Sequence, residues 1–351
     1  MLLTLVGLVV LHSISLQEVA PSQSFNPVVQ IMAALLGIAA MIVMARLDYR
    51  LLVRIAPMWY MVAIGLLALV LIVGETVSGA TRSIELGFFE FQPTEVAKIG
   101  LILMMARYYS MHSHSLGKIR YVLGSLLLLG FVAAFILMQP DLGSVVLISA
   151  VWFIMTAMSS MRRVYVVALI VIAAAMIPVV SSQLEPYQQA RISSFFDPAA
   201  DPQGQGYNVN QAMIAVGSGQ LLGRGLGGGT QSSLNFIPAQ HTDFIFAVLA
   251  EKLGLLGGGV VIALFGVVIW RGILIAYRAR DRFGMLLAVG VVSAIFVQTV
   301  ITIGMNLGVA PVTGLPLPFI AYGGTSLMMS LFAIGILQSI ATHSQELHFR
   351  D

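Results

Sequence analysis

Long runs of apolar residues, separated by short polar segments, make up most of the chain. A helix that crosses a bilayer needs about 20 consecutive and mainly apolar residues. We predict a transmembrane helix in each of ten stretches: 1–16, 27–46, 55–74, 94–110, 121–139, 142–160, 164–182, 243–270, 284–307 and 323–342. The apolar runs are continuous and do not alternate with polar residues, which disfavours a membrane β-barrel. The pattern therefore predicts an all-α polytopic membrane protein, with a single transmembrane domain over residues 1–351.

The first apolar stretch begins at Met1 and is short, as the apolar core of a signal peptide is. It lacks the basic segment and the small-residue cleavage site of such a peptide. We therefore interpret residues 1–16 as the first span.

The composition changes this picture only by excluding other classes of protein. Hydrophobic residues make up 58% of the chain and charged residues 9%, whereas a soluble domain carries about 25% charged residues. The sequence contains no cysteine, which excludes disulfides, thiol catalysis and thiolate metal sites.

The positions of the charges predict the orientation in the membrane. Lys and Arg in short loops mark the cytoplasmic side. Ten alternating spans with a cytoplasmic N-terminus place both termini, four acidic residues and 13 of the 18 basic residues on that side: Arg46, Arg50, Arg54, Arg107, Lys118, Arg120, Arg162, Arg163, Arg271, Arg278, Arg280, Arg282 and Arg350. The basic excess thus reflects topology, and nothing in it indicates nucleic-acid binding.

The remaining charges are the functional candidates, because a charge within the membrane costs about 2.5–3.5 kcal/mol and usually faces a cavity or a partner. The polar residues outside the cytoplasmic loops gather in four segments: 75–98, 139–144, 183–242 and 306–326. The last contains three prolines and several glycines. Irregular backbone at membrane depth is tolerated only where it lines a cavity or is buried in protein. We therefore expect these segments to build an outward-facing polar cavity.

Two of these segments carry charges beside a helix start. Glu95 and Lys98 are three residues apart, so they share one face of the span 94–110. They are either functional groups of the cavity or a structural ion pair. Asp141 follows Pro140 and can cap the helix that begins there, or it can serve the function; the residues alone favour neither role.

The long loop 183–242 contains two further patterns. Residues 208–222 have an apolar face with helical spacing, which predicts an amphipathic helix at the membrane surface. Gly223, Gly225 and Gly228 match a dinucleotide-binding pattern, but no βαβ unit surrounds them. A tight turn is favoured over a loop that offers backbone amides to a phosphate.

Asp243 stands where the loop ends and the span 243–270 begins. A carboxylate there can complement the positive end of the helix dipole, and an ionised carboxylate can also act as a general base. Glu251 lies about two turns deeper on a similar face, and the adjacent Lys252 points elsewhere. This chemistry alone does not single out Asp243.

Four strings of residues carry a family resemblance: FQPTEVAKI at 91–99, QPDLGS at 139–144, HTDFIFAVLAEKLGLLG at 241–257 and NLGVAPVTGLPLPFIAYGGTSL at 306–327. Together with the ten-span layout, they resemble the SEDS (shape, elongation, division and sporulation) family from end to end. The stretch 229–254 is more similar to the elongation branch than to the division branch. One departure is Lys252, which stands where a second acid is common.

The resemblance implies a peptidoglycan glycosyltransferase that polymerises lipid II. It also implies a divalent cation, Mg or Mn, and a class B penicillin-binding protein as the transpeptidase partner. By similarity, Asp243 matches the essential aspartate of the family's long extracellular loop. Glu95, Lys98 and Arg191 match polar positions that line the family's central cavity.

We therefore expect Asp243 to accept the proton of the attacking sugar hydroxyl. Growing charge on the departing diphosphate needs a cation or a basic side chain. Glu95 would orient a lysine or help to hold the metal, so Glu95 and Asp243 are the candidate metal ligands. The expected cavity and substrate-binding residues are Glu95, Lys98, Asp141, Arg191, Arg224, Glu251 and Lys252.

Two other functions fit the same features. A lipid II flippase would also place polar groups among ten spans, although no inverted repeat is visible in the hydropathy. A non-catalytic scaffold for cell-wall enzymes is the second alternative, but it would not need Glu95 and Lys98 within the membrane.

Overall fold

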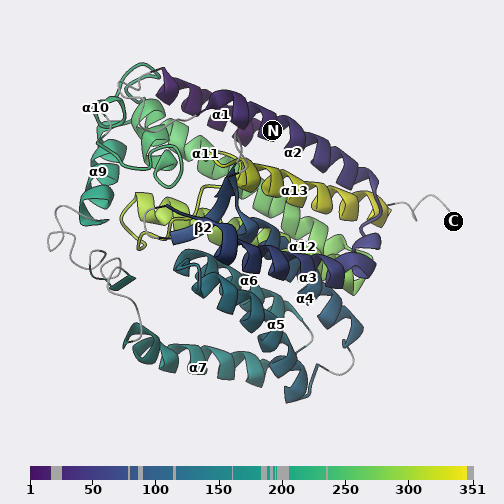
Figure 1. Cartoon of the computed structure of the whole chain (residues 1–351). Coiled ribbons are helices and arrows are strands. Elements are labelled where there is room, and N and C mark those ends of the chain that lie inside the picture. Colours follow the sequence, from purple (N-terminus) through teal and green to yellow (C-terminus); the bar gives the residue numbers. More distant parts are fainter. Residues whose placement is uncertain are drawn as a thin grey trace. The chain divides into compact units, whose positions relative to one another are not determined.

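The structure is a computed structural model. It describes residues 1–16, 26–77, 80–85, 90–113, 116–159, 161–182, 188–189, 193, 195, 205–234 and 236–345. Helices dominate these residues (Figure 1). The predicted all-α class is therefore confirmed.

A helix occupies each of the ten stretches in which the apolar pattern predicts one. They are α1 (Leu2–Ser15), α2 (Pro27–Arg46), α3 (Leu51–Val73), α4 (Pro93–Met111), α5 (Ile119–Leu137), α6 (Leu142–Met158), α7 (Arg163–Ser182), α11 (Ile245–Arg278), α12 (Arg282–Asn306) and α13 (Gly324–Gln345). Two helices of the long loop are also described, α9 (Gln205–Ser218) and α10 (Thr230–Ser233). The first of these confirms a helix in the stretch 208–222, although it begins at Gln205 and ends at Ser218; its place at the membrane surface stays a prediction.

Six helices in the described part of the chain are long and apolar enough to cross a membrane: α2, α3, α5, α11, α12 and α13. The helices α1, α6 and part of α7 are apolar but shorter. Large apolar side chains are exposed on the long helices, for example Leu35 of α2, Leu127 of α5 and Val260 of α11, as expected where a helix faces lipid. The protein is a multi-pass membrane protein, and the count of ten spans stays a prediction.

A small antiparallel sheet precedes α4, in a segment for which the sequence indicated only polar and turn-forming residues. Its strands are β1 (Glu75–Val77), β2 (Ala80–Glu85) and β3 (Glu90–Phe91), in the order β1-β2-β3. The register pairs Val77 with Ala80 and Ile84 with Phe91. This hairpin sheet ties the end of α3 to the start of α4.

The chain divides into two compact units. The first comprises Met1–Ala34, Gln183–Val268 and Gln298–Leu327, and the second comprises Leu35–Ser182, Ile269–Val297 and Met328–Asp351. The prediction of one domain over the whole chain stays a prediction.

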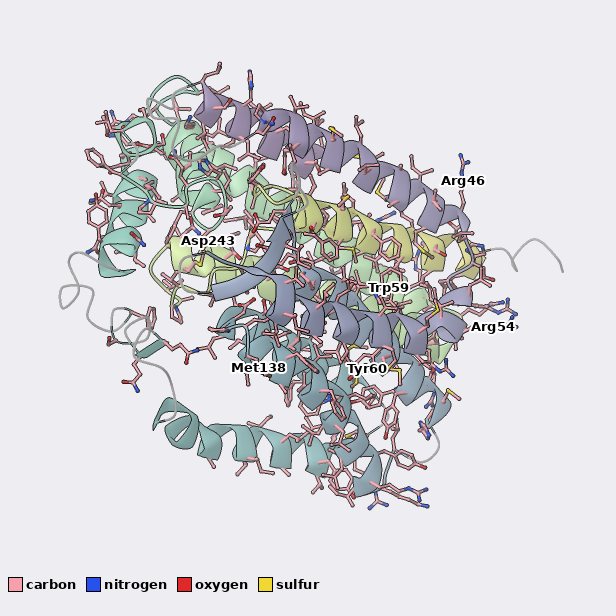
Figure 2. The ribbon with its side chains drawn as sticks, viewed as in Figure 1. Arg46, Arg54, Trp59, Tyr60, Met138 and Asp243 are labelled. Atoms are coloured by element: carbon pink, nitrogen blue, oxygen red, sulfur yellow. The ribbon has the colours of Figure 1, made fainter. Side chains whose placement is uncertain are left out.

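The second unit is built around α4, which contacts α3, α5 and α6 (Figure 1). Buried residues lie all around this helix, as expected for a helix in the interior of a bundle. Trp59 of α3 donates from its indole nitrogen to the main-chain oxygen of Val96, at 3.3 Å. A Cβ at Gly100 would lie only 3.0 Å from the Trp59 ring, so the glycine allows α3 and α4 to approach closely. Tyr60 of α3 donates to the main-chain oxygen of Leu128 of α5, at 2.6 Å; Figure 2 labels Trp59 and Tyr60.

Two loops of the second unit are joined by a buried tyrosine. Tyr49 lies between α2 and α3, and its hydroxyl donates a hydrogen bond to the carboxylate of Asp281, which lies between α11 and α12. Burial and this carboxylate raise the pKa of Tyr49 from 10.0 to about 12. The tyrosine is fully buried, so its neutral form holds the two loops together.

The first unit contains the irregular segment 307–323, which is held by a polar stripe on α12. Gln298, Thr302 and Asn306 follow one another at intervals of four residues, so they share one helix face. The Gln298 side chain donates to the main-chain oxygen of Pro316, at 2.8 Å, and the Thr302 hydroxyl donates to that of Leu315, at 3.2 Å. All three stripe residues are buried. The stripe therefore supplies the hydrogen bonds that irregular backbone needs at membrane depth.

The end of this segment is held by α2. Gln30, which is buried, donates from Nε2 to the main-chain oxygen of Ala321, at 3.2 Å, and accepts at Oε1 from the amide of Gly323, at 3.3 Å. Segment 307–323 is thus held in its middle by Gln298 and Thr302 of α12 and at its end by Gln30 of α2.

Candidate functional site

Asp243 lies two residues before the start of α11 and is half-buried (Figure 2). The side chain of Asn306, at the end of α12, holds its backbone: Nδ2 donates to the main-chain oxygen of Asp243, at 2.9 Å. The Oδ1 atom of the same side chain accepts from the amide of Ala247, at 2.9 Å. The first amides of a helix lack partners within the helix, so Asn306 caps α11 from a neighbouring helix. This bond fixes the backbone from which the Asp243 carboxylate projects.

A second backbone bond holds the loop just before Asp243. The main-chain oxygen of His241 accepts from the amide of Tyr322, at 2.8 Å. Burial lowers the pKa of the His241 imidazole from 6.5, which favours its neutral form. The backbone on both sides of Thr242 is thus anchored, to Tyr322 before it and to Asn306 after it.

The helix α11 is interrupted at Gly254, one turn beyond the expected site residues. Its backbone there has φ 70° and ψ −170°, a conformation that favours glycine. The interruption leaves backbone groups of α11 without helical partners, and residues 220–225 of the long loop supply them. The amides of Arg224 and Gly225 donate to the main-chain oxygens of Glu251 and Lys252, at 2.9 and 3.0 Å.

These bonds decide between the two roles considered for the glycine-rich loop. Gly223 and Gly225 have positive φ angles, 84° and 83°, and the amides of Gly223, Gly225 and Gly228 all donate to main-chain oxygens within the protein. The glycines therefore form a tight turn, as favoured from the sequence. Their amides are not directed at an outside phosphate.

Glu251 is fully buried and caps the short helix α10. Its Oε1 accepts from the amide of Gln231, at 2.9 Å, and its Oε2 accepts from the amide of Ser232, at 3.0 Å. A Cβ at Gly229 would lie 2.9 Å from Oε2, so only glycine leaves room for the carboxylate. Both carboxylate oxygens thus hold protein backbone, which indicates a structural role.

Lys252 is also fully buried, and it points toward α1. Its Nζ donates to the hydroxyl of Ser13, at 2.6 Å, and to the main-chain oxygen of Leu226, at 3.3 Å. Glu251 and Lys252 therefore contact different elements, as their adjacent positions predict. The lysine joins α1 to the glycine-rich loop.

Glu95 and Lys98 form the predicted pair on α4. Lys98 Nζ lies 2.7 Å from Glu95 Oε2, and the two side chains are 9% and 6% exposed, lysine first. Such a buried pair gives little net stability, but loss of one partner is costly because the other charge stays buried. The shared face is confirmed, and the pair suits either a structural or a functional role.

Three expected residues remain. Asp141 is buried and caps α6, where its two oxygens accept from the amide and the hydroxyl of Ser144, at 3.1 and 2.6 Å. Arg224 is exposed and donates from Nε to the main-chain oxygen of Ser218, at 2.9 Å. Arg191 lies outside the described residues.

The side chains available as ligands limit how a divalent cation would be held. No group of three or more His, Asp or Glu side chains occurs among the residues that the structure describes. Mg²⁺ in phosphate-transferring sites usually takes only one or two carboxylates and completes its shell with water and substrate phosphates. Single carboxylates such as Glu95 or Asp243 fit that mode of binding.

From the sequence, we did not identify three residues of α12 whose side chains hold the backbone of the segment 307–323 and of Asp243: Gln298, Thr302 and Asn306. Their signal was present, because three polar residues at four-residue intervals interrupt an otherwise apolar span. Such a stripe indicates a buried polar contact within the membrane.

Comparisons with known proteins agree with this fold. The family model described as FtsW/RodA/SpoVE, cell cycle protein, matches residues 1–346. The peptidoglycan glycosyltransferase MrdB of Escherichia coli strain K12 is 39% identical over 320 residues, which are 89% of this chain and 84% of that protein.

Two solved structures are similar over nearly the whole chain. One comes from work titled "Structural coordination of polymerization and crosslinking by a peptidoglycan synthase complex"; it has a TM-score of 0.77 and 29% identity, and covers 99% of this chain and 98% of its own. The other is a mutant of the Rod shape determining protein RodA of Thermus thermophilus, with a TM-score of 0.68, 26% identity, and coverage of 100% and 96%. The chain belongs to the FtsW/RodA/SpoVE family, the SEDS proteins.

Proposed function

We propose that the chain polymerises lipid II into glycan strands during cell-wall elongation and releases undecaprenyl diphosphate. The chain is a peptidoglycan glycosyltransferase of cell-wall synthesis, as its relative MrdB is. The lipid-linked substrate suits a membrane-embedded enzyme, because its polyprenyl tail stays in lipid while its sugars reach water. The elongation branch is proposed on the similarity of residues 229–254 to that branch.

The assignment of the catalytic base rests on the exposure of the candidate carboxylates. Of the four candidate carboxylates in the described residues, Glu95, Asp141 and Glu251 are 5%, 2% and 0% exposed. Asp243 alone among these four is partly exposed. A general base must reach the proton that it removes. Asp243 is therefore the carboxylate best placed to meet a substrate, on a backbone that Asn306 holds still.

In the proposed reaction, a sugar hydroxyl of the acceptor attacks the anomeric carbon of the lipid-linked donor. The Asp243 carboxylate takes the hydroxyl proton as the new glycosidic bond forms and the bond to the diphosphate breaks. Lys98, Arg191 and Arg224 are the proposed cationic groups for the diphosphate, to which arginine offers two parallel hydrogen bonds. When bound, a divalent cation would add positive charge beside the same diphosphate, held by Glu95 or Asp243.

The proposed setting is the bacterial cytoplasmic membrane, with both termini in the cytoplasm and the polar cavity facing outward. The excess of Lys and Arg in the loops assigned to the cytoplasm supports this orientation. A transpeptidase of the class B penicillin-binding protein type is the proposed partner, since a structural neighbour is described as part of a complex that coordinates polymerization and crosslinking.

Lipid II supplied to the purified chain tests the proposal. Formation of glycan polymer in detergent supports the synthase. Movement of lipid II across a liposome bilayer without polymer would instead indicate a flippase. Absence of both, with binding of the transpeptidase intact, would indicate a scaffold.

A further inference from the structure

A cavity of about 640 Å³ lies in the second unit, between the C-terminal ends of α11 and α13. Its lining includes Arg271, Leu274 and Arg278 of α11, and Ala341 and Ser344 of α13. The volume falls in the range of about 300–1,000 Å³ that is typical of small-ligand sites. None of the groups used in the proposed reaction occurs in the described lining of the cavity.

The α11 wall of the cavity is one continuous helix face. Arg271, Leu274 and Arg278 lie at positions i, i+3 and i+7, with Ile275 at i+4, and such positions stand above one another on a helix. The two arginines are therefore about 10 Å apart along the helix axis. Between them lie apolar side chains, so the cavity wall alternates from cationic to apolar to cationic.

The arginines of this wall are available to a ligand. Arg271 and Arg278 are exposed, and within the part of the chain that the structure describes neither guanidinium forms an ion pair. The hydroxyl group of Tyr277 also belongs to the lining, whereas the Ser344 hydroxyl donates to the main-chain oxygen of Ile340, at 2.6 Å. The cavity thus presents two permanent positive charges and one hydroxyl donor, a donor set that matches a phosphate group.

The cavity also lies where the helix leaves the apolar part of the membrane. The apolar stretch of α11 ends at Trp270, and Arg271 follows it directly. Trp270 is 61% exposed and Tyr277 is 87% exposed, as is usual for aromatic residues at a membrane–water interface. The excess of Lys and Arg assigns this end to the cytoplasm, and the cytoplasmic leaflet carries anionic lipids.

We propose that this cavity binds the head group of an anionic glycerophospholipid of the cytoplasmic leaflet, with its phosphate between Arg271 and Arg278. The acyl chains run from there along the exposed apolar surface of α11 toward the hydrocarbon. Charge and setting together favour a lipid over a soluble phosphate, because a soluble ion would gain nothing from Leu274, Ile275 and the exposed aromatic residues. The lipid would fasten the cytoplasmic ends of α11 and α13 to each other.

Lipid retention tests the proposal on the full chain. The protein is purified from membranes that contain phosphatidylglycerol and phosphatidylethanolamine, and bound lipid is counted by native mass spectrometry. Each basic residue near an anionic surface contributes about 1 kcal/mol, so Arg271→Gln/Arg278→Gln is expected to weaken phosphatidylglycerol binding about 30-fold. The control Arg54→Gln/Arg163→Gln removes two exposed charges from the same predicted side, outside the cavity, and is expected to retain the lipid.

Two further measurements distinguish a lipid site from poor folding and from a site for free phosphate. Arg271→Lys/Arg278→Lys keeps both charges and is expected to retain most of the lipid, even if the glutamine variant folds poorly. Inorganic phosphate is expected not to displace the lipid; full displacement by phosphate would overturn a lipid site. Equal lipid retention by the glutamine variant and its control would also overturn it, and would leave the arginines as partners of the negative helix ends.

Discussion

The side-chain amide of Asn306 donates a hydrogen bond to the main-chain oxygen of Asp243, at 2.9 Å. Through its other end the same side chain accepts from the amide of Ala247, and it also donates to the main-chain oxygen of Thr302, at 2.7 Å. Asn306 is fully buried. One side chain therefore joins the end of α12 to the backbone of the proposed catalytic residue.

Replacing Asn306 by leucine is expected to slow the reaction while sparing substrate affinity. The change leaves the Asp243 oxygen without this partner, at a cost of about 1–3 kcal/mol for a buried group, while the Ala247 amide keeps its bond to the main-chain oxygen of Phe244, at 3.1 Å. A base that is displaced by about 1 Å can lose about 100-fold in rate. The initial rate of glycan formation from lipid II should therefore show a lower kcat with a nearly unchanged KM.

The variant Asn306→Asp separates positioning from simple loss of stability. Aspartate keeps an acceptor for Ala247 but has no donor for Asp243. We expect a melting temperature between those of the wild type and Asn306→Leu, together with a low kcat. A wild-type kcat in both variants would show that Asn306 does not position the base.

Replacing Glu251 tests its role as a cap. Because both of its oxygens accept backbone amides of α10, Glu251→Leu should lower the melting temperature in detergent. Glu251→Gln keeps one acceptor and should lower it less. The KM for lipid II, measured below the melting temperature, should stay near the wild-type value; a raised KM with unchanged stability would instead place Glu251 at the substrate.

The pair Glu95–Lys98 is tested by exchanging its charges. Either Glu95→Gln or Lys98→Gln leaves a buried charge unpaired, and such changes cost about 3–5 kcal/mol. The double variant Glu95→Lys/Lys98→Glu restores an ion pair at the same spacing, so it should recover much of the melting temperature. It should not recover activity if Lys98 faces the diphosphate. Recovery of both stability and rate would make the pair structural only.

The buried Tyr49 predicts how stability changes in alkali. Its pKa is about 12 in the folded protein and 10.0 when unperturbed, so between these values the folded state holds a proton that the unfolded state has released. Stability from this group is thus complete below pH 10 and is lost as the pH rises toward 12. The melting temperature of Tyr49→Phe should fall less steeply over this range than that of the wild type; parallel curves would contradict the account.

The helices could be predicted from the sequence because their signal is local. Continuous apolar runs leave few alternatives, and each predicted stretch holds a helix in the structure. The small sheet at 75–91 gave no comparable signal. Its strands are two to six residues long, which is too short for an alternating pattern to stand out from a polar loop.

The site could be predicted only as a set of residues, because its geometry depends on contacts between distant segments. The family resemblance selected Asp243, but the sequence did not indicate that Asn306, 63 positions away, would hold its backbone. Glu251 and Lys252 were expected in the cavity. Their contacts with α10 and α1 join segments that are far apart in the sequence, and the apolar pattern of α11 gives no sign of them.

The rate of glycan formation by Asp243→Asn tests the central claim most directly. The asparagine keeps the size of the side chain but cannot accept the proton of a sugar hydroxyl as a base. Asp48→Asn is the matched control, because Asp48 lies in the loop between α2 and α3, where its Oδ1 accepts the amide of Arg50 and asparagine keeps that acceptor. With purified protein and lipid II, Asp243→Asn should melt as the wild type does and form no polymer, whereas Asp48→Asn should polymerise normally. Polymerisation by Asp243→Asn at the wild-type rate would contradict the assignment of Asp243 as the base.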